Sequence, residues 1–311
     1  MEDASPIEIK PGLFALDLKP MGIKYFLSTY VLKGREVAIV DCGPFCSIET
    51  LIKGLEALGV SPKSLRFVIA THIHIDHVGG ASELLKWASD AELLVHEKGV
   101  KHIADPRRLW ESTRAVLGEL ADAYGPIGAV DADRIVGLRD GDEIEIAGWS
   151  VLQVLETPGH ASHHLSFFEP EERIIFPGDS AGIYIAQLDV LLPTTPPPHR
   201  LDLALESLDK QIELGPKTAC YPHFGSTDEA VLKLSEHKRQ LEFWAEVIRD
   251  RLAEPEERIL DFLVRHDSNL ARISDIMRAY PMLKEGLLRS IKGIKGFFSR
   301  GARGHQRAVQ R

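Results

Sequence analysis

Four side chains that commonly bind metal ions lie within six consecutive positions: His72, His74, Asp76 and His77. Imidazole and carboxylate groups bind borderline divalent metals such as zinc when several converge from different backbone directions. The apolar run Phe67 to Ala70 before them predicts a buried strand, and the first two histidines, two positions apart on an extended segment, would point the same way. The aspartate and the last histidine follow on a turn, before a helix predicted to begin near Gly80. This spacing predicts metal ligands contributed by a strand end and a turn.

Three more candidate ligands each follow a short apolar strand and a glycine or proline: His160, Asp179 and His223. The strands predicted before them cover residues 152–156, 174–176 and 218–221. A lone histidine is more often a surface residue than a ligand, but these three share one local pattern. Together with the four residues above they give seven candidate ligands.

The order of these residues resembles the motif series of the metallo-β-lactamase-fold hydrolases, and among them the glyoxalase II-like branch. That series is an early aspartate, a His-x-His-x-Asp-His motif, a later histidine, an aspartate and a last histidine, and here it runs from Asp41 to His223. The resemblance covers roughly residues 10 to 225. It implies an α+β fold, a four-layer αββα sandwich with the site at one edge of the two sheets.

The same resemblance implies how the ligands divide between two metal ions. One ion would be bound by His72, His74 and His160, and the other by Asp76, His77 and His223, with Asp179 bridging both. A bridging carboxylate offsets the repulsion between two divalent cations. Such ions, Zn²⁺ foremost and Fe or Mn as alternatives, would lower the pKa of a bridging water toward neutrality. The expected reaction is hydrolysis, in which the bridging hydroxide attacks and one of the two aspartates, Asp76 or Asp179, receives the proton.

The fold implied by the resemblance hosts several chemistries on nearly the same ligands, so the substrate stays open. We expect an enzyme that hydrolyses a small thioester, ester or lactone. One alternative is a mononuclear iron persulfide dioxygenase, which uses a single metal site. Another is a metallo-nuclease or phosphodiesterase that uses a basic C-terminal tail to bind nucleic acid.

Further residues are candidates for supporting roles around the ligands. Asp41 follows a strand predicted at 37–40, and we expect it to accept a hydrogen bond from a ligating histidine. His164 is a candidate for similar support, for a substrate contact or for simple packing. Tyr184 is a candidate donor to a substrate carbonyl, or else a buried core aromatic. Residues 193–198, which we name the proline loop, would form a stiff wall facing the substrate.

The composition is that of an ordinary soluble protein. The 311 residues carry a net charge of −9, and 44% of them are hydrophobic. No apolar run approaches the ~18 residues that a membrane span requires, and the first residues lack the features of a secretory signal. The three cysteines are too few for a disulfide framework. We therefore expect a cytoplasmic enzyme that acts on a small molecule, and the negative charge argues against general nucleic-acid binding.

The last predicted strand covers residues 218–221, and a long helix predicted at 229–252 and further helical patterns follow. We therefore divide the chain into a catalytic domain, residues 1–227, and a C-terminal helical extension, residues 228–311. Within the first part, a helical insertion at 97–133 is long enough to arch over a site. The extension ends in a tail without acidic residues that carries seven basic ones: Arg289, Lys292, Lys295, Arg300, Arg303, Arg307 and Arg311. This tail fits an anionic partner or a solvated terminus, and the extension offers helices through which a homodimer could form.

Overall fold

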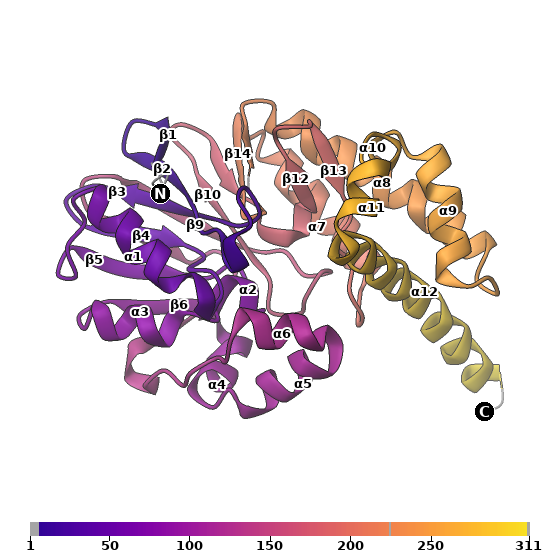
Figure 1. Cartoon of the computed structure of the whole chain (residues 1–311), viewed down its shortest axis with the longest axis horizontal. Helices are drawn as coiled ribbons and strands as arrows, with labels where there is room; N and C mark the ends of the chain where they lie inside the picture. The colour runs from indigo at the N-terminus through magenta and orange to yellow at the C-terminus, as the bar shows by residue number, and fades with distance from the viewer. Residues whose placement is uncertain (1–5, 224, 310–311) are drawn as a thin grey trace.

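Two β-sheets pack face to face, and helices cover the outer face of each (Figure 1). The structure is a computed structural model that describes residues 6–223 and 225–309. It has the α+β, four-layer αββα arrangement that the ligand order implies, with additional C-terminal helices. Of the predicted basic tail, residues 310 and 311 and the side chains from 301 onward lie outside the described residues. No helix in the described part of the chain is long and apolar enough to cross a bilayer.

The first sheet contains seven strands that lie side by side in chain order. They are β1 (Ile7–Lys10), β2 (Leu13–Asp17), β3 (Ser28–Lys33), β4 (Val37–Val40), β5 (Leu65–Ile69), β6 (Glu92–His96) and β7 (Ile135–Leu138). Strands β1 to β4 pair with one another in antiparallel fashion, and strands β4 to β7 pair with one another in parallel fashion. The carboxyl ends of β4 and β5 therefore lie at the same edge of the sheet.

The second sheet contains six strands in the order β15-β14-β11-β10-β9-β8. They are β8 (Glu143–Ile146), β9 (Ser150–Glu156), β10 (Leu165–Glu169), β11 (Ile174–Phe176), β14 (Thr218–Tyr221) and β15 (Gly225–Thr227). Strands β9 and β11 are both antiparallel to β10, and β14 is parallel to β11. Strands β9, β11 and β14 therefore also end at one edge. A separate hairpin of β12 (Ile183–Ile185) and β13 (Val190–Leu192) follows β11.

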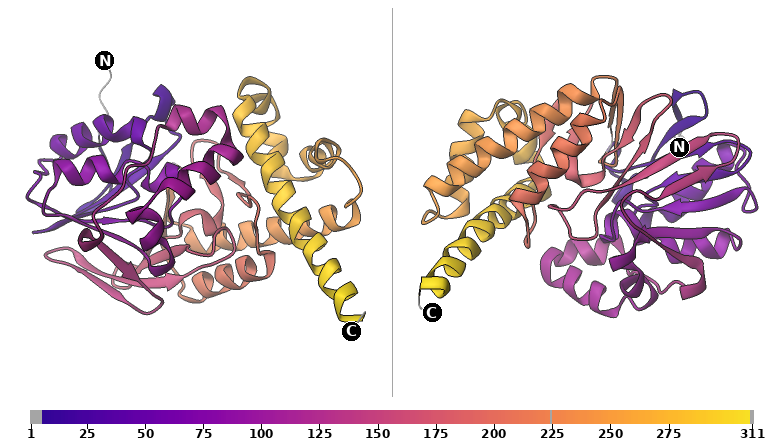
Figure 2. Two further views of the ribbon diagram at one scale, coloured as in Figure 1. Left: turned by 90° about the horizontal axis from the view of Figure 1, so that it is seen from below. Right: turned by 180° about the vertical axis from the view of Figure 1, so that it is seen from behind.

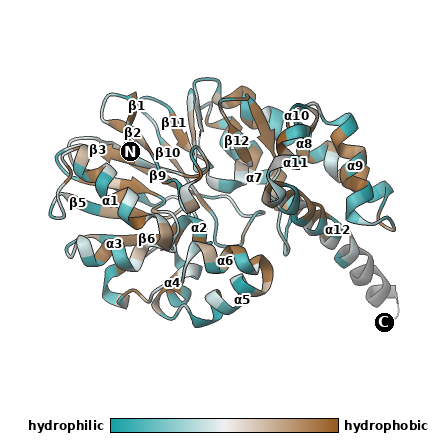
Figure 3. Ribbon diagram, viewed as in Figure 1, coloured by the Kyte–Doolittle hydropathy of each residue, from teal (hydrophilic) through white to brown (hydrophobic). Residues whose placement is uncertain are grey.

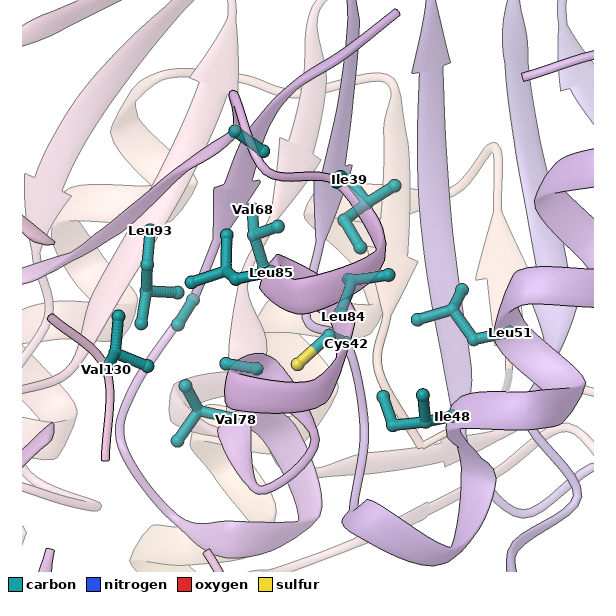
Figure 4. Packing of buried hydrophobic residues seen from close by; sticks show 14 of the residues in the cluster. Ile39, Cys42, Ile48, Leu51, Val68, Val78, Leu84, Leu85, Leu93 and Val130 are labelled. Carbon is teal, nitrogen blue, oxygen red and sulfur yellow. The ribbon is translucent and has the colours of Figure 1, made fainter. Parts of the chain in front are cut away.

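Helices between the strands of the first half cover the outer face of the first sheet. They are α1 (Ile48–Ala57), α2 (Ile75–Val78), α3 (Ala81–Trp87), α4 (Glu97–Ala104), α5 (Arg107–Leu117) and α6 (Glu119–Tyr124). Leu51 of α1 and Leu84 of α3 pack in one apolar cluster with Ile39 of β4 and Val68 of β5 (Figure 4). Strand β4 is buried on both faces, because Ala38 and Val40 alternate with Ile39 and face the other sheet.

The two sheets contact each other through a second apolar cluster and through hydrogen bonds near the candidate site. Tyr30 of β3 packs edge-on against Phe176 of β11, with ring centroids 5.6 Å apart. The Tyr30 hydroxyl lies 2.8 Å from the carbonyl oxygen of Tyr221. The Ser28 backbone N–H donates to the Pro222 carbonyl over 2.7 Å. These contacts fix the end of β14, which precedes His223, relative to the first sheet.

The outer face of the second sheet is covered by α7 (Leu201–Glu213) and by the C-terminal helices. These are α8 (Ala230–Asp250), α9 (Glu256–His266), α10 (Ser268–Arg272), α11 (Ser274–Ala279) and α12 (Pro281–Val309). Figure 3 shows hydrophobic residues on the faces of α8 and α9. Leu234 and Trp244 of α8 share one buried cluster with Ile175 of β11 and Ala219 of β14. The division of the chain after residue 227 stays a prediction, and this shared core joins the two parts closely.

Most of the longer predicted elements match the structure, and the differences are local. The apolar run Tyr25 to Leu32 predicts a strand by its sequence, but in the structure the strand begins only at Ser28. Tyr25 has a φ of 57°, outside the strand region, and its N–H donates to the Asp17 carboxylate. The predicted turn that carries Asp76 and His77 forms the short helix α2. The short strands β1, β12, β13 and β15 were not predicted.

We expect replacement of Asp267 to loosen the C-terminal helices from α8. This buried carboxylate accepts hydrogen bonds from Trp244 Nε1 (2.7 Å), Gln240 Nε2 (2.9 Å) and the N–H of Asn269 at the start of α10 (2.9 Å). Asp267→Ala leaves these buried donors unpaired and should lower the free energy of unfolding by about 3 kcal/mol. Urea unfolding measures the change, and the exposed Asp261→Ala on α9 is the matched control, expected within about 0.5 kcal/mol of wild type. Equal effects of both substitutions would contradict this account of the packing.

Candidate metal centre

All seven candidate ligands lie just beyond strand ends at one edge of the sandwich. The four in the cluster 72–77 follow β5, and the others follow three parallel strands of the second sheet: His160 after β9, Asp179 after β11 and His223 after β14. In open sheets with parallel strands, ligands bind outside the carboxyl ends of the strands. The structure therefore brings together the residues that the sequence pattern singles out.

Three imidazole nitrogens converge on one point. His72 Nε2 lies 2.9 Å from His74 Nδ1, and His160 Nε2 lies 3.0 Å from the same atom. His72 and His160 are buried, with 0% and 6% of their surface exposed. The ligand atoms of all three histidines lie within 4.8 Å of one another. Three nitrogen donors at this spacing can bind one metal ion.

A second group lies beside the first. Asp76 Oδ2 lies 3.9 Å from His77 Nε2 and 4.0 Å from His223 Nε2. Ligand atoms of these three residues also lie within 4.8 Å of one another. Asp76 and His77 lie on α2, whose single helical turn redirects the backbone after His74. Phe26 covers His223 on one side, with the two ring centroids 6.1 Å apart.

Asp179 lies between the two groups and faces both. Its Oδ1 is 3.5 Å from His77 Nε2 and 3.5 Å from His223 Nε2, and its Oδ2 is 3.6 Å from His160 Nε2. Among the described residues, Asp179 Oδ1 and His77 Nε2 are buried without a hydrogen-bond partner. Unpartnered buried polar atoms are costly, and a cation among them would satisfy both. The donor set and these two atoms therefore fit metal ions.

Asp41 orients histidines of both groups from behind. Its carboxylate accepts a hydrogen bond from His77 Nδ1 over 2.9 Å, so His77 Nε2 is left facing Asp179. It also accepts bonds from the N–H (2.8 Å) and the hydroxyl (2.9 Å) of Thr71. The Thr71 oxygen in turn lies 3.1 Å from His72 Nδ1. Asp41 has the supporting position predicted from the sequence, whereas the part played by Thr71 was not predicted.

His164 supports Asp179 through the backbone. Its Nε2 accepts hydrogen bonds from the N–H groups of Asp179 (3.0 Å) and Ser180 (3.3 Å). An accepting Nε2 places the ring proton on Nδ1, which lies 2.8 Å from the Thr157 hydroxyl. A Cβ at Gly178, whose φ is 56°, would lie 2.6 Å from His164 Nε2. The close approach of this ring therefore requires glycine before Asp179.

The pKa shifts show that the centre favours a positive charge. Burial lowers the pKa of His72 and His160, which keeps these rings neutral and able to bind a metal. Burial opposes protonation of His77 as well, yet Asp179, Asp41 and Asp76 raise its pKa to about 10. Burial alone would raise the pKa of Asp179, but the charges of His223, His77 and His160 hold it well below its usual range. The three carboxylates therefore favour a positive charge beside His77, which a bound metal ion would supply.

Two further histidines and two cysteines of the chain have structural contacts. His96 accepts a hydrogen bond from the N–H of Lys98 at the start of α4, and His163 Nδ1 lies 3.5 Å from the N–H of Ile73. Cys42 is buried with its thiol against the carbonyl of His77, and Cys46 is exposed. Both are free thiols.

The structure places Tyr184 in the core rather than in an open position. Only 6% of its surface is exposed, and its hydroxyl donates to Asp189 Oδ1 over 3.0 Å. Its ring packs against that of Tyr221, with centroids 5.3 Å apart. Of the two predicted alternatives, a core aromatic fits this environment better than a substrate contact.

One contact to a candidate ligand was not predicted at all. His160 Nδ1 donates to the carbonyl oxygen of Thr194 in the proline loop over 2.8 Å. A backbone carbonyl is present at every residue, so the sequence carries no signal for this role. The proline loop therefore acts on the metal centre through its backbone, in addition to any contact of its prolines with a substrate.

Comparison with known proteins agrees with this architecture. The sequence profile of the metallo-beta-lactamase superfamily matches residues 25–223. ST1585, a metallo-beta-lactamase fold-containing protein of Sulfurisphaera tokodaii, is 31% identical over 235 residues, which cover 74% of this chain and 84% of that protein. The crystal structure of ST1585 from Sulfolobus tokodaii superposes with a TM-score of 0.64 over 74% of this chain and 85% of that one.

Two further relatives extend the comparison. The metallo-beta-lactamase family protein TTHA1429 from Thermus thermophilus is 22% identical, with a TM-score of 0.68 over 95% of this chain and 96% of that one. Because the match covers nearly the whole chain, the shared fold includes C-terminal helices. The hydroxyacylglutathione hydrolase GloC of Haemophilus influenzae is 29% identical over 153 residues, which are 47% of this chain and 61% of that protein.

We expect Asp41→Asn to weaken metal binding without disturbing the local backbone. Asp41 has a φ of 58°, a conformation that asparagine tolerates as well as aspartate does. The amide loses the charge that orients His77 and Thr71, so metal affinity should fall about 10- to 100-fold. Metal content per chain after dialysis against graded chelator measures the effect. Asp133→Asn, at an exposed aspartate just before β7, is the control and should match wild type. Unchanged affinity in the Asp41 variant would refute its orienting role.

Proposed function

The chain belongs to the metallo-beta-lactamase superfamily, and from this premise we propose that it is a hydrolase with two metal ions, preferably zinc. One observation carries the proposal. The seven candidate ligands form three overlapping groups, and the groups share His72 and His77. Overlap of this kind supports two neighbouring ions better than one, since each group of mutually close ligand atoms contains only three of the seven side chains.

Each ion has a distinct set of protein ligands in this proposal. His72, His74 and His160 would hold one ion, and Asp76, His77 and His223 the other. Asp179 would contact both, because its two carboxylate oxygens face different groups. When bound, two divalent ions lower the pKa of water toward 7 and polarise a carbonyl oxygen, which supplies a nucleophile without a serine or cysteine.

The two aspartates near the ions have different surroundings, and these suit different roles. The Asp76 side chain is 21% exposed, whereas that of Asp179 is 4% exposed. We propose that the Asp76 carboxylate accepts the proton that water releases, because Asp76 can return that proton to solvent. Asp179 is held by its backbone bond to His164 and stays between the two groups. It therefore serves as a fixed counter-charge.

A small thioester, ester or lactone is the substrate class that we propose. The hydroxyacylglutathione hydrolase GloC, whose name describes a thioester hydrolase, shares 29% identity over 153 residues with this chain. That match covers 61% of GloC, so it supports the class of bond and leaves the leaving group open. Carbonyl compounds of this class need only an activated water and a polarised oxygen, which is the chemistry that such a centre supplies.

Replacement of the central carboxylate should abolish most hydrolysis. Asp179→Ala removes a ligand from both groups, so we expect the rate to fall by about a hundredfold or more and metal content to drop. The measurement is the initial rate of hydrolysis of a substrate that the wild-type protein hydrolyses, together with the metal content per chain. Asp202→Ala, at an exposed aspartate of α7 that pairs with Arg200, is the matched control and should retain the wild-type rate. Full activity in the Asp179 variant would refute its place between the ions.

A substrate panel should distinguish the proposed function from its alternatives. Protein with assayed metal content is offered thioesters, esters, lactones, phosphodiesters and a persulfide. We expect hydrolysis of at least one carbonyl substrate, loss of that activity with chelator and recovery with zinc. Oxygen consumption with the persulfide and one iron per chain would instead identify the dioxygenase alternative. Turnover of phosphodiesters alone would identify a nuclease or phosphodiesterase.

A further inference from the structure

The side chain of His160 is oriented by one backbone carbonyl of the proline loop. A carbonyl oxygen only accepts hydrogen bonds, so the bond from His160 Nδ1 to Thr194 places the ring proton on Nδ1. The Nε2 lone pair is then free and lies 3.0 Å from His74 Nδ1, inside the first group. Movement of the Thr194 carbonyl would rotate this ring or change its tautomer.

The backbone beside His160 is held by the residues that follow the same loop. The N–H of Arg200, two residues after the proline loop, donates to the carbonyl of Gly159 over 3.1 Å. Gly159 has a φ of 140°, and a Cβ there would lie 2.5 Å from the Cα of Ala204 in α7. The proline loop therefore holds the His160 side chain, and Arg200 just after the loop holds the carbonyl of the preceding Gly159.

The other side of the proline loop is bonded to the C-terminal helix α12. The Ser290 hydroxyl donates to the carbonyl of Pro193 (3.0 Å) and accepts from the N–H of Thr195 (3.2 Å). The Thr195 hydroxyl donates to the carbonyl of Ser290 over 2.9 Å. Only 3% of Ser290 and 2% of Thr195 are exposed, so these bonds are shielded from water. These bonds hold the two neighbours of Thr194, Pro193 and Thr195, against α12.

Two further contacts of α12 involve the same loop and its neighbour. A Cβ at Gly293 would lie 1.7 Å from the carbonyl oxygen of Thr195, so the helix and the loop meet at a point where only glycine fits. Arg300 Nη2 donates to the carbonyl of His199 over 2.7 Å. Figure 2 shows α12, in yellow, at the edge of the molecule. The helix contacts the loop at successive turns.

We propose that α12 is part of the metal centre, with Ser290 and Gly293 as positioning residues that act on His160 through Thr194. This inference rests on the proposed function, because it takes His160 as a metal ligand. The helix belongs to the part of the chain beyond the family match at 25–223. Displacement of α12 would selectively weaken the ion bound by His72, His74 and His160. Among the described residues, no hydrogen bond joins the proline loop to Asp76, His77 or His223, which would bind the other ion.

A matched pair of glycine substitutions on α12 tests this inference. Gly293→Ala forces the helix and the Thr195 carbonyl apart, whereas a Cβ at Gly296 would meet only the far end of Arg300, at 3.4 Å. Both substitutions exchange glycine for alanine inside the same helix, so their effects on helix propensity are equal. Zinc-loaded full-length protein is titrated with a chromogenic chelator, and metal released per chain is recorded. The Gly293→Ala variant should release one of its two ions at an about tenfold lower chelator concentration than wild type and the second ion at an unchanged concentration. The Gly296→Ala variant should match wild type for both ions.

A serine pair supplies a milder test that leaves the helix in place. Ser290→Ala removes the acceptor of the Thr195 N–H, and we expect the same selective release, about threefold to tenfold earlier. The control is Ser299→Ala on the same helix, because the exposed Ser299, as far as the described residues go, bonds to the Lys295 carbonyl of its own helix and not to the proline loop. Release at the wild-type chelator concentration in both the Ser290 and Gly293 variants would overturn the inference.

A double substitution separates positioning of His160 from general loss of stability. In an His160→Ala background the ring is absent, so Gly293→Ala should have no further effect on metal release. An additional loss of both ions in the double variant would show a general structural role and overturn the inference. A wild-type protein that holds no zinc would instead overturn the proposed function. Wild-type metal binding with no difference between the Gly293 and Gly296 variants would overturn the inference alone.

Discussion

Face-to-face packing of the two sheets keeps the candidate ligands together, because neither sheet carries a complete set. The group of His72, His74 and His160 takes two residues from the first sheet and one from the second. The group of Asp76, His77 and His223 is divided in the same way. The bonds from β3 to the end of β14, and the apolar cluster between the sheets, therefore set the distances within both groups. A shift of one sheet against the other would separate every proposed ligand set.

The chemistry of the centre follows from the charges that this packing buries. Buried carboxylates and imidazoles need partners, and hydrogen bonds satisfy most of them from behind, through Asp41, Thr71, His164 and the Thr194 carbonyl. The atoms that remain, Asp179 Oδ1 and His77 Nε2, face the centre itself. Metal ions would pair these atoms, so metal binding and stability of the folded state should be coupled.

The layers could be predicted from the sequence, and the seven candidate ligands that it singles out lie together in the structure, since both depend on local patterns. Apolar runs followed by a lone histidine or aspartate identify strand ends, and parallel strands bring such ends together. The loop at Tyr25 was mistaken for strand because its left-handed backbone depends on Asp17, a distant partner. The bond from His160 to Thr194 had no signal, because it uses a backbone carbonyl. The contact of Gly293 with the proline loop joins segments almost one hundred residues apart, which no local pattern reveals.

In the proposed centre, seven side chains from the two sheets hold two metal ions on either side of Asp179. Anomalous X-ray diffraction from crystals of the zinc-loaded protein, recorded above and below the zinc absorption edge, locates each ion directly. Two peaks are expected, one about 2.1 Å from nitrogens of His72, His74 and His160, and one at similar distances from Asp76, His77 and His223. A single peak, or peaks bound by other residues, would contradict it.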